Sequence, residues 1–77
     1  LKPHETIFVN GGSGGVGSTV IQMAKALGAR VFACAGADEK VAACRALGAE
    51  AAFNYRTQKI GEELKKVAPA GVNVWWE

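Results

Sequence analysis

The sequence predicts an α/β protein built on a parallel sheet, and three observations support this prediction. Short, unbroken apolar runs alternate with longer segments whose apolar residues recur at helical spacing. The tetrapeptide Ala-Leu-Gly-Ala occurs at 26–29 and again at 46–49, each time where a helix would end before a strand. A cluster of glycines separates the first apolar run from the first helical segment. Strands that alternate with helices need right-handed crossovers, which give a parallel sheet with both faces covered.

The first strand is expected at about residues 6–10, where the apolar run is continuous, and the first helix at about 15–27. One stripe at 3.6-residue spacing is expected to face the core, and it comprises Val16, Val20, Met23, Ala24 and Leu27. Gly28 follows directly, where a left-handed helix cap is needed.

The second unit repeats this pattern, with a strand at 30–35 and a helix at 38–47 that ends at Gly48. The residues expected on its inner face are Val41, Cys44 and Leu47. Cys34 and Cys44 form no Cys-x-x-Cys pair, so two buried, reduced cysteines are favoured over a zinc or redox site.

The last part predicts a short strand at 51–54, a helix at about 58–67 and a fourth strand at 72–76. The inner face of that helix comprises Ile60, Leu64 and Val67. Trp75 and Trp76 are neighbours on a strand and should point to opposite faces. Packing is favoured for both, with stacking on a bound cofactor as the alternative.

This element order predicts the strand order 3-2-1-4 of a Rossmann-like sheet, with the first two helices on one face and the third on the other. A complete doubly wound sheet has more strands and helices. Residues 1–77 are therefore expected to be the N-terminal portion of such a domain in a longer chain, as the absence of an initiator Met also indicates. Some apolar sheet surface should remain for further chain or a partner to cover.

The composition excludes several classes of function. The net charge is only +2, which argues against nucleic-acid or membrane partners, and no apolar run could span a bilayer. No nucleophile–base pair, metal-ligand cluster or carboxylate pair is present, so no catalytic or metal-binding residue is assigned. His4 is interpreted as a surface turn residue. The location is expected to be cytoplasmic.

The glycine cluster contains Gly12, Gly14 and Gly17 in the pattern G-x-G-x-x-G. Gly12 would permit a tight turn, Gly14 would let the backbone approach a pyrophosphate, and Gly17 would let the helix pack closely on the strand. The flanking strand and helix favour a dinucleotide site over a flexible turn without ligand. A P-loop is excluded, because no Gly-Lys-Ser/Thr follows.

The choice of dinucleotide depends on the end of the second strand, where NAD-binding units commonly place an acid. This strand ends in Ala35-Gly36-Ala37, and the following Asp38 is more simply explained as a helix N-cap. Lys40, Tyr55 and Arg56 could instead hold a 2′-phosphate, although Arg56 alone could be a solvated surface charge. The combination favours NADPH over NADH.

The segments at 9–18, 22–25, 36–40 and 54–56 together resemble the zinc-free medium-chain dehydrogenase/reductases, most of all the quinone oxidoreductase (zeta-crystallin-like) branch. The resemblance implies that Ser13, Gly14, Gly15 and Val16 contact the pyrophosphate. It further implies that Lys40 and Tyr55 bind the 2′-phosphate, and that Gly36 stands where NAD-using relatives carry an acid.

The family implies hydride transfer from NADPH to a quinone or an α,β-unsaturated carbonyl in a homo-oligomer. Its members have a further domain that forms most of the substrate cleft, so these 77 residues alone are expected to be inactive. A non-catalytic dinucleotide-binding module is the alternative. A methyltransferase that uses S-adenosylmethionine is disfavoured, because it would want an acid where Gly36 stands.

Overall fold

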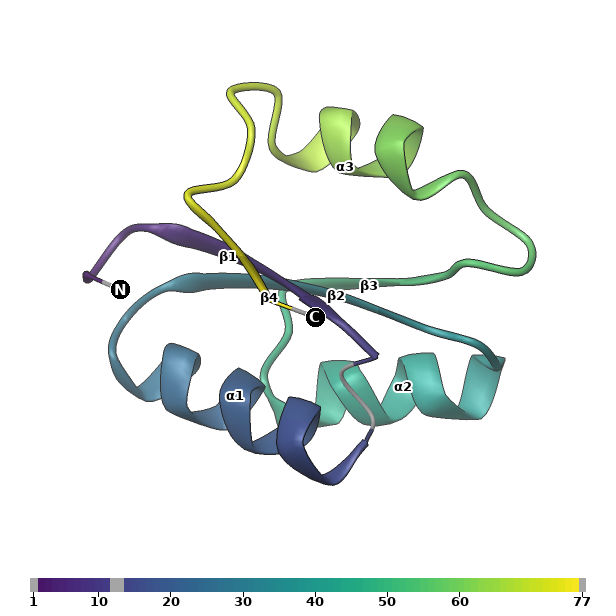
Figure 1. Cartoon of the computed structure of the whole chain (residues 1–77), viewed down its shortest axis with the longest axis horizontal. Coiled ribbons are helices and arrows are strands. Elements are labelled where there is room, and N and C mark those ends of the chain that lie inside the picture. The colour runs from purple at the N-terminus through teal and green to yellow at the C-terminus, as the bar shows by residue number, and fades with distance from the viewer. Residues whose placement is uncertain (1, 12–13, 77) are drawn as a thin grey trace.

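The computed structural model describes residues 2–11 and 14–76, and this part contains a four-stranded sheet flanked by helices (Figure 1). In chain order the elements are β1 (Thr6–Asn10), α1 (Gly15–Ala26), β2 (Arg30–Ala35), α2 (Asp38–Leu47), β3 (Ala51–Asn54), α3 (Ile60–Val67) and β4 (Val74–Trp76). All pairings are parallel and the strand order is β3-β2-β1-β4. The predicted 3-2-1-4 order is confirmed.

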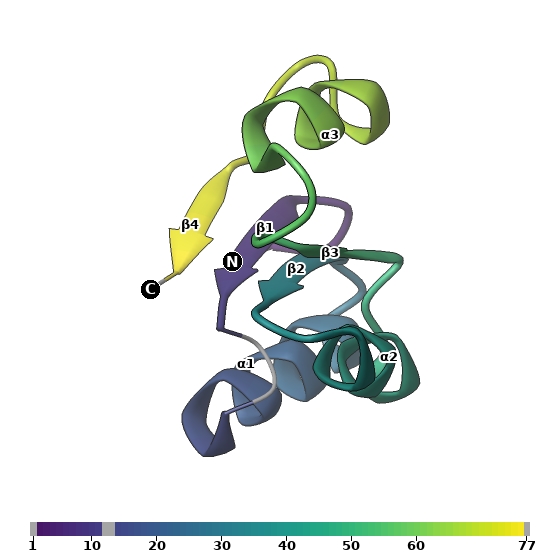
Figure 2. The same cartoon turned by 90° about the vertical axis from the view of Figure 1, so that its right-hand side faces the viewer.

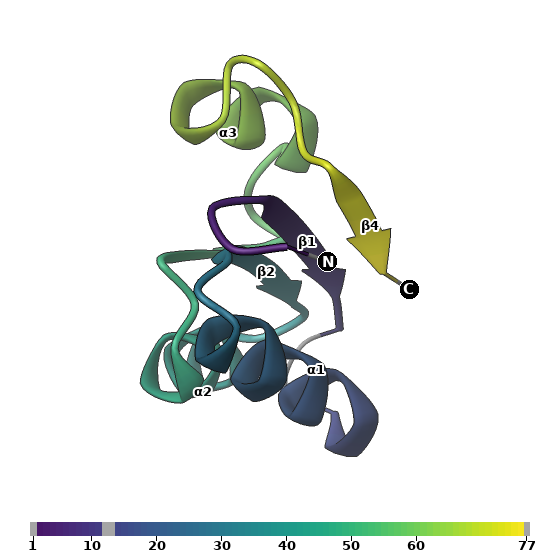
Figure 3. The same cartoon turned by 90° about the vertical axis from the view of Figure 1, so that its left-hand side faces the viewer.

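The sheet separates two layers of helices. In Figure 2 and Figure 3, α1 and α2 lie together on one face and α3 lies alone on the other, as expected from the crossovers. Successive strand residues alternate between the two cores. Ile7 and Val9 pack toward α1 and α2, whereas Phe8 packs toward α3. Both faces of β1 are therefore buried, which explains its continuous apolar sequence.

The predicted inner stripe of α1 is wrong in part. The helix buries Gly17, Ile21 and Ala24, whereas Val16, Met23 and Leu27 are 68%, 61% and 51% exposed. Ala24 is the predicted member that is buried, and Val20 is partly buried against the same core. Two neighbouring faces of this helix are both rich in apolar residues, so spacing alone does not decide which of them the sheet covers.

The inner faces predicted for the second and third helices are confirmed. Cys44 is fully buried under α2, with Val41 and Leu47 packed beside it, and Ile60, Leu64 and Val67 pack on the other core. Gly28 and Gly48 follow α1 and α2 with φ values of 86° and 123°, the left-handed region predicted for these helix ends. Among the described residues, both cysteines are buried and free.

Two elements begin later than the sequence suggests. Helix α3 begins at Ile60 rather than residue 58, because the Gln58 side chain accepts a hydrogen bond from the Asn54 backbone N–H (2.9 Å). Strand β4 begins at Val74 rather than residue 72. Asn73 contacts the start of β1 instead, and its side-chain oxygen accepts from the Thr6 N–H at 2.8 Å. These side-chain hydrogen bonds add to backbone ones at both places, since the Asn73 and Gln58 N–H groups donate to the Thr6 and Asn54 carbonyl oxygens at 2.9 Å.

The two tryptophans of β4 point to opposite faces, as predicted. Trp76 packs against the core under α1 and α2, and Trp75 stacks on Phe8 on the α3 side. Trp75 is nevertheless 52% exposed, consistent with the expectation that apolar surface remains uncovered here. His4 is an exposed turn residue with φ 68°, also as predicted. No helix in the described ranges is long and apolar enough to cross a membrane.

Candidate functional site

The residues that follow β1, β2 and β3 meet at one edge of the sheet, since parallel strands all end there. After β1 the chain turns at Gly11, whose φ is 71°. The Gly11 N–H donates to the Cys34 carbonyl oxygen (3.1 Å), and the Gly14 N–H donates to the Gly11 carbonyl oxygen (3.1 Å). These bonds bring the start of α1 back toward the end of β1. Gly12 and Ser13, both predicted cofactor contacts, lie outside the described residues.

Helix α1 begins without a side-chain cap, at Gly14, whose backbone is extended. Its first turn carries no acidic residue, and the hydroxyl groups of Ser18 and Thr19 donate back to the Gly15 carbonyl oxygen (2.9 and 3.0 Å). A β-carbon at Gly15 would meet nothing within 4 Å. The first-turn N–H groups have no carbonyl partner within the helix, and such groups bind anions at helix N-termini.

The other predicted helix-start residues divide between the two sides of α1. Val16 is exposed, so it can contact a ligand at this edge but does not belong to the core. Gly17 is buried against the sheet, as expected for a glycine that permits close helix–strand packing.

Gly36, Tyr55 and Arg56 lie together at the carboxyl ends of β2 and β3. A β-carbon built on Gly36 would stand 2.6 Å from the Tyr55 hydroxyl oxygen and 3.5 Å from Arg56 Nε. Tyr55 is 51% exposed, and its hydroxyl group lies over Gly36. The adjacency of β2 and β3 in the sheet brings these residues together from positions 19 and 20 apart in the chain.

Lys40 lies in the exposed first turn of α2, four residues after Gly36. Its backbone N–H donates to the Ala37 carbonyl oxygen (3.0 Å), so the residue belongs to the helix start and not to the strand end. The structure thus brings Gly36, Tyr55 and Arg56 into one cluster and places Lys40 on the helix that follows it.

The prediction that Asp38 caps α2 is wrong. The N-cap residue is Ala37, with no side-chain hydrogen bond to the helix, and Asp38 is the first helical residue. Asp38 Oδ1 instead accepts a hydrogen bond from the Asn54 side-chain amide nitrogen (2.9 Å). The Asp38 carboxylate is therefore hydrogen-bonded to Asn54 at the end of β3 and does not cap the helix.

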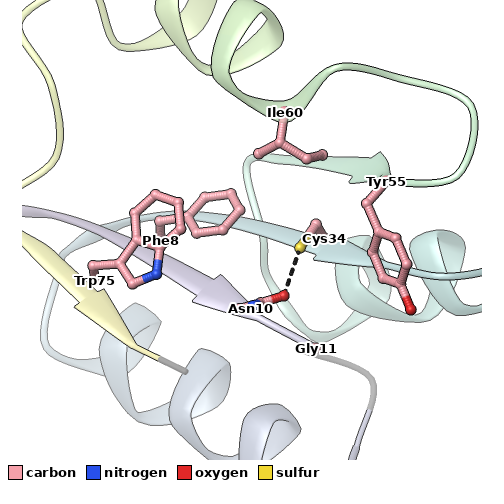
Figure 4. Close-up of a pocket in the computed structure, with 7 residues that line it drawn as sticks. All are labelled: Phe8, Asn10, Gly11, Cys34, Tyr55, Ile60 and Trp75. Atoms are coloured by element: carbon pink, nitrogen blue, oxygen red, sulfur yellow. Dashed lines mark hydrogen bonds between the residues drawn. The ribbon is translucent and has the colours of Figure 1, made fainter.

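A pocket of about 460 Å³ opens beside these residues on the α3 side of the sheet (Figure 4). Its lining residues come from the ends of the strands and from the start of α3: Phe8, Asn10, Gly11, Cys34, Tyr55, Ile60 and Trp75. The Trp75 ring stacks on Phe8 with the centroids 4.4 Å apart. Apart from Tyr55, and Trp75 as the alternative to a packing role, none of these residues was predicted as a site residue. Strand alternation could have identified Phe8, Asn10 and Cys34 as sharing one face. Ile60 joins them from helix α3, which covers that same face.

The thiol in this pocket is held neutral. Cys34 Sγ donates to Asn10 Oδ1 (3.1 Å), and burial raises the pKa of the Cys34 thiol, with the Gly11 backbone N–H acting in the opposite sense. Burial also raises the pKa of the Cys44 thiol. Neither cysteine has the lowered pKa of a thiolate nucleophile. Within the described ranges, no three or more His, Cys, Asp or Glu side chains gather in a way that could hold a metal ion.

Comparison with known proteins places these features in a family. The family model described as zinc-binding dehydrogenase matches residues 15–77. Prostaglandin reductase 1 of Sus scrofa is 45% identical over 78 residues, which cover 100% of this chain and 24% of the relative. This chain therefore spans about a quarter of the length of the curated relatives it matches.

Solved structures of oxidoreductases also match this chain. The quinone oxidoreductase of Escherichia coli, solved in complex with NADPH, matches with a TM-score of 0.85 and 35% identity, over 90% of this chain and 21% of that one. A 2-haloacrylate reductase matches with a TM-score of 0.96 and 29% identity, over 100% of this chain and 24% of that one. The chain therefore belongs to the zinc-binding dehydrogenase family, in the quinone oxidoreductase branch of the medium-chain dehydrogenase/reductase superfamily.

Proposed function

We propose that this chain holds the pyrophosphate and the adenosine 2′-phosphate of NADPH for an oxidoreductase that reduces a quinone or an α,β-unsaturated carbonyl. The reaction is assigned to the whole protein, since the chain spans only about a quarter of its curated relatives. The names of the similar proteins, among them a quinone oxidoreductase with NADPH and a 2-haloacrylate reductase, support this class of substrate and this cofactor.

The start of α1 fits a pyrophosphate. Gly14 and Gly15 bear no side chain, and the space where a β-carbon of Gly15 would stand is open. The helix N-terminus adds a partial positive charge to its free N–H groups. A doubly charged pyrophosphate could therefore approach the backbone closely, without a lysine in the loop.

The observation that carries the choice of NADPH is the cluster of Tyr55 and Arg56 over Gly36. A hydroxyl donor and a guanidinium, placed where β2 ends without an acid, favour a phosphate on the ribose 2′-oxygen. Lys40, in the exposed first turn of α2, adds a positive charge four residues after Gly36. A carboxylate at position 36 would repel that phosphate and would clash with Tyr55.

When bound, the reduced nicotinamide supplies a hydride to the substrate, which also takes up a proton. The residues of this chain would bind and orient the adenosine end of the cofactor. Orientation at that end contributes to the reaction because binding energy from remote parts of a ligand positions its reacting part.

The test is a calorimetric titration of the chain with 2′,5′-ADP and, separately, with 5′-AMP. We expect 2′,5′-ADP to bind about ten-fold more tightly or better, the effect of charge-assisted hydrogen bonds to one phosphate. Lys40→Ala and Tyr55→Phe should each reduce this preference. Lys65→Ala, which removes the same charge from the exposed side of α3, is the matched control and should leave the preference unchanged.

Equal affinity for the two nucleotides would remove the 2′-phosphate assignment of Lys40, Tyr55 and Arg56. A folded chain that binds neither nucleotide would contradict the proposed site as a whole.

A further inference from the structure

We propose that Asn54 is a specificity-determining residue of the nucleotide site, because it holds the Asp38 carboxylate away from the ribose. The inference rests on the proposed NADPH site and adds a residue and a role to it. Asp38 is the acidic side chain nearest in sequence to the end of β2, so its position bears directly on the choice between NADPH and NADH.

Asn54 is a buried polar residue whose side-chain nitrogen and oxygen are both hydrogen-bonded. It is 7% exposed, at the last position of β3. Its side-chain nitrogen donates to Asp38 Oδ1 at 2.9 Å, and its side-chain oxygen accepts from the Arg56 backbone N–H at 2.9 Å. One amide thus fixes both the acid at the start of α2 and the backbone of the turn that carries Tyr55 and Arg56.

The orientation of this amide follows from its partners. A rotation that exchanged its oxygen and nitrogen would set two acceptors against each other at Asp38 and two donors against each other at Arg56. The backbone of Asn54 is held as well, since its N–H donates to Gln58 Oε1 and its carbonyl oxygen accepts from the Gln58 N–H, both at 2.9 Å. Asn54 therefore presents a fixed donor to Asp38.

A released Asp38 would have a different partner available. It lies 21 positions after Gly17 (38 − 17), close to the spacing at which NAD-binding units place the acid that accepts from the ribose 2′-hydroxyl. The same carboxylate would repel a 2′-phosphate. By tying Asp38 to the end of β3, Asn54 lowers the affinity for a free 2′-hydroxyl and preserves the affinity for a 2′-phosphate.

Asn54→Ser tests this without a change of charge. The serine hydroxyl can still accept from the Arg56 N–H in the same type of turn, but it is too short to reach Asp38. We expect 5′-AMP to bind more tightly and 2′,5′-ADP more weakly, so that the preference for 2′,5′-ADP falls about ten-fold. The matched control is Asp38→Ala with and without Asn54→Ser. With no carboxylate to release, the preference should be the same in both.

Circular dichroism and thermal unfolding establish that each variant is folded. If Asn54→Ser unfolds, Asn54→Asp keeps the size and the acceptor for Arg56 while repelling Asp38. Its own charge weakens 2′,5′-ADP binding, so the measured quantity is then the affinity for 5′-AMP. That affinity should rise in the presence of Asp38 and stay unchanged in the Asp38→Ala background.

A parallel loss of affinity for both nucleotides in the Asn54 variants would overturn the inference, since it would show a merely structural role. An equal change of preference with and without Asp38 would also overturn it. If the wild-type chain binds neither nucleotide, the proposed function fails and the inference fails with it. If the wild type prefers 2′,5′-ADP and the variants keep that preference, the inference fails alone.

Discussion

The Tyr55 hydroxyl group occupies the space over Gly36 that a side chain at that position would need, with 2.6 Å between its oxygen and a β-carbon built on Gly36. The two residues directly follow the neighbouring strands β2 and β3, and nothing in their local sequence brings them together. The contact links the lack of an acid after β2 to the presence of a hydroxyl donor after β3, which we propose binds the 2′-phosphate. The glycine at position 36 and the Tyr55 hydroxyl group, which both bear on the proposed preference for NADPH, therefore depend on each other.

Gly36→Ala should therefore weaken 2′,5′-ADP binding several-fold while changing the stability little. The new methyl group must displace the Tyr55 hydroxyl, which can move because the side chain is half-exposed. Calorimetry and thermal unfolding measure the two effects. The matched control is Gly61→Ala in α3, where a β-carbon meets nothing within 4 Å. It should stabilise the chain by about 0.5–1 kcal/mol and leave binding unchanged.

Gly15→Ala should separate stability from binding at the start of α1. A β-carbon at Gly15 meets nothing within 4 Å beyond its own stretch of helix, and alanine favours the helix by about 1 kcal/mol, so the melting temperature should rise. The same methyl group would stand where the pyrophosphate approaches. The affinities for ADP and 2′,5′-ADP should fall by similar factors. Unchanged affinity for both would show that the phosphates bind elsewhere.

The two apolar faces of α1 should respond differently to truncation. Ile21 is fully buried, so Ile21→Val should lower the free energy of unfolding by about 1 kcal/mol. Met23 is 61% exposed, and Met23→Ala should stay within about 0.5 kcal/mol of wild type. Urea titrations of both variants compare the two faces directly. A larger loss for Met23→Ala would mean that the exposed stripe is covered in solution.

The ion pair between Arg30 and Glu50 should give a pH-dependent contribution to stability. Their closest atoms, Arg30 Nη2 and Glu50 Oε2, are 2.6 Å apart, and the hydrogen bond from Arg30 lowers the pKa of Glu50. A carboxyl group with a lowered folded-state pKa stabilises the fold above its unfolded pKa and loses that contribution as the pH falls through the folded value.

Glu50→Gln should accordingly lower the melting temperature slightly at pH 7. The difference from wild type should shrink as the pH falls below the usual glutamate pKa of about 4.3, and it should also shrink in 1 M salt, because both side chains are about half-exposed. Thermal unfolding across a pH series measures this. A difference that grows on acidification would contradict the assigned pair.

The element order, the strand order and the two helix-ending glycines were predictable because each depends on local signals. An unbroken apolar run indicates a strand buried on both faces, and crossover handedness then fixes the neighbours of that strand. Gly28 and Gly48 were predictable because few residues other than glycine adopt a left-handed backbone without strain. The neighbouring positions of Gly36 and Tyr55 followed from the predicted adjacency of the second and third strands.

Three features were not predictable in this way. The buried face of α1 depends on how the helix rotates against the sheet, and spacing alone favoured the wrong apolar residues. Asp38 looked like a helix cap because its true partner, Asn54, lies 16 residues further along the chain. The pocket residue Ile60 comes from α3, and its place beside Phe8 and Cys34 depends on how that helix packs on the sheet.

By itself, then, the sequence determined which segments are strands and helices, how they connect and where a glycine-rich turn leads from the first strand to the first helix. Those properties follow from side-chain periodicity and from the backbone freedom of glycine, which act over a few residues. The tertiary structure decided which apolar face is buried, which partner holds Asp38 and which side chains close the pocket. These depend on contacts between residues far apart in the chain, where packing and hydrogen bonding outweigh local preference.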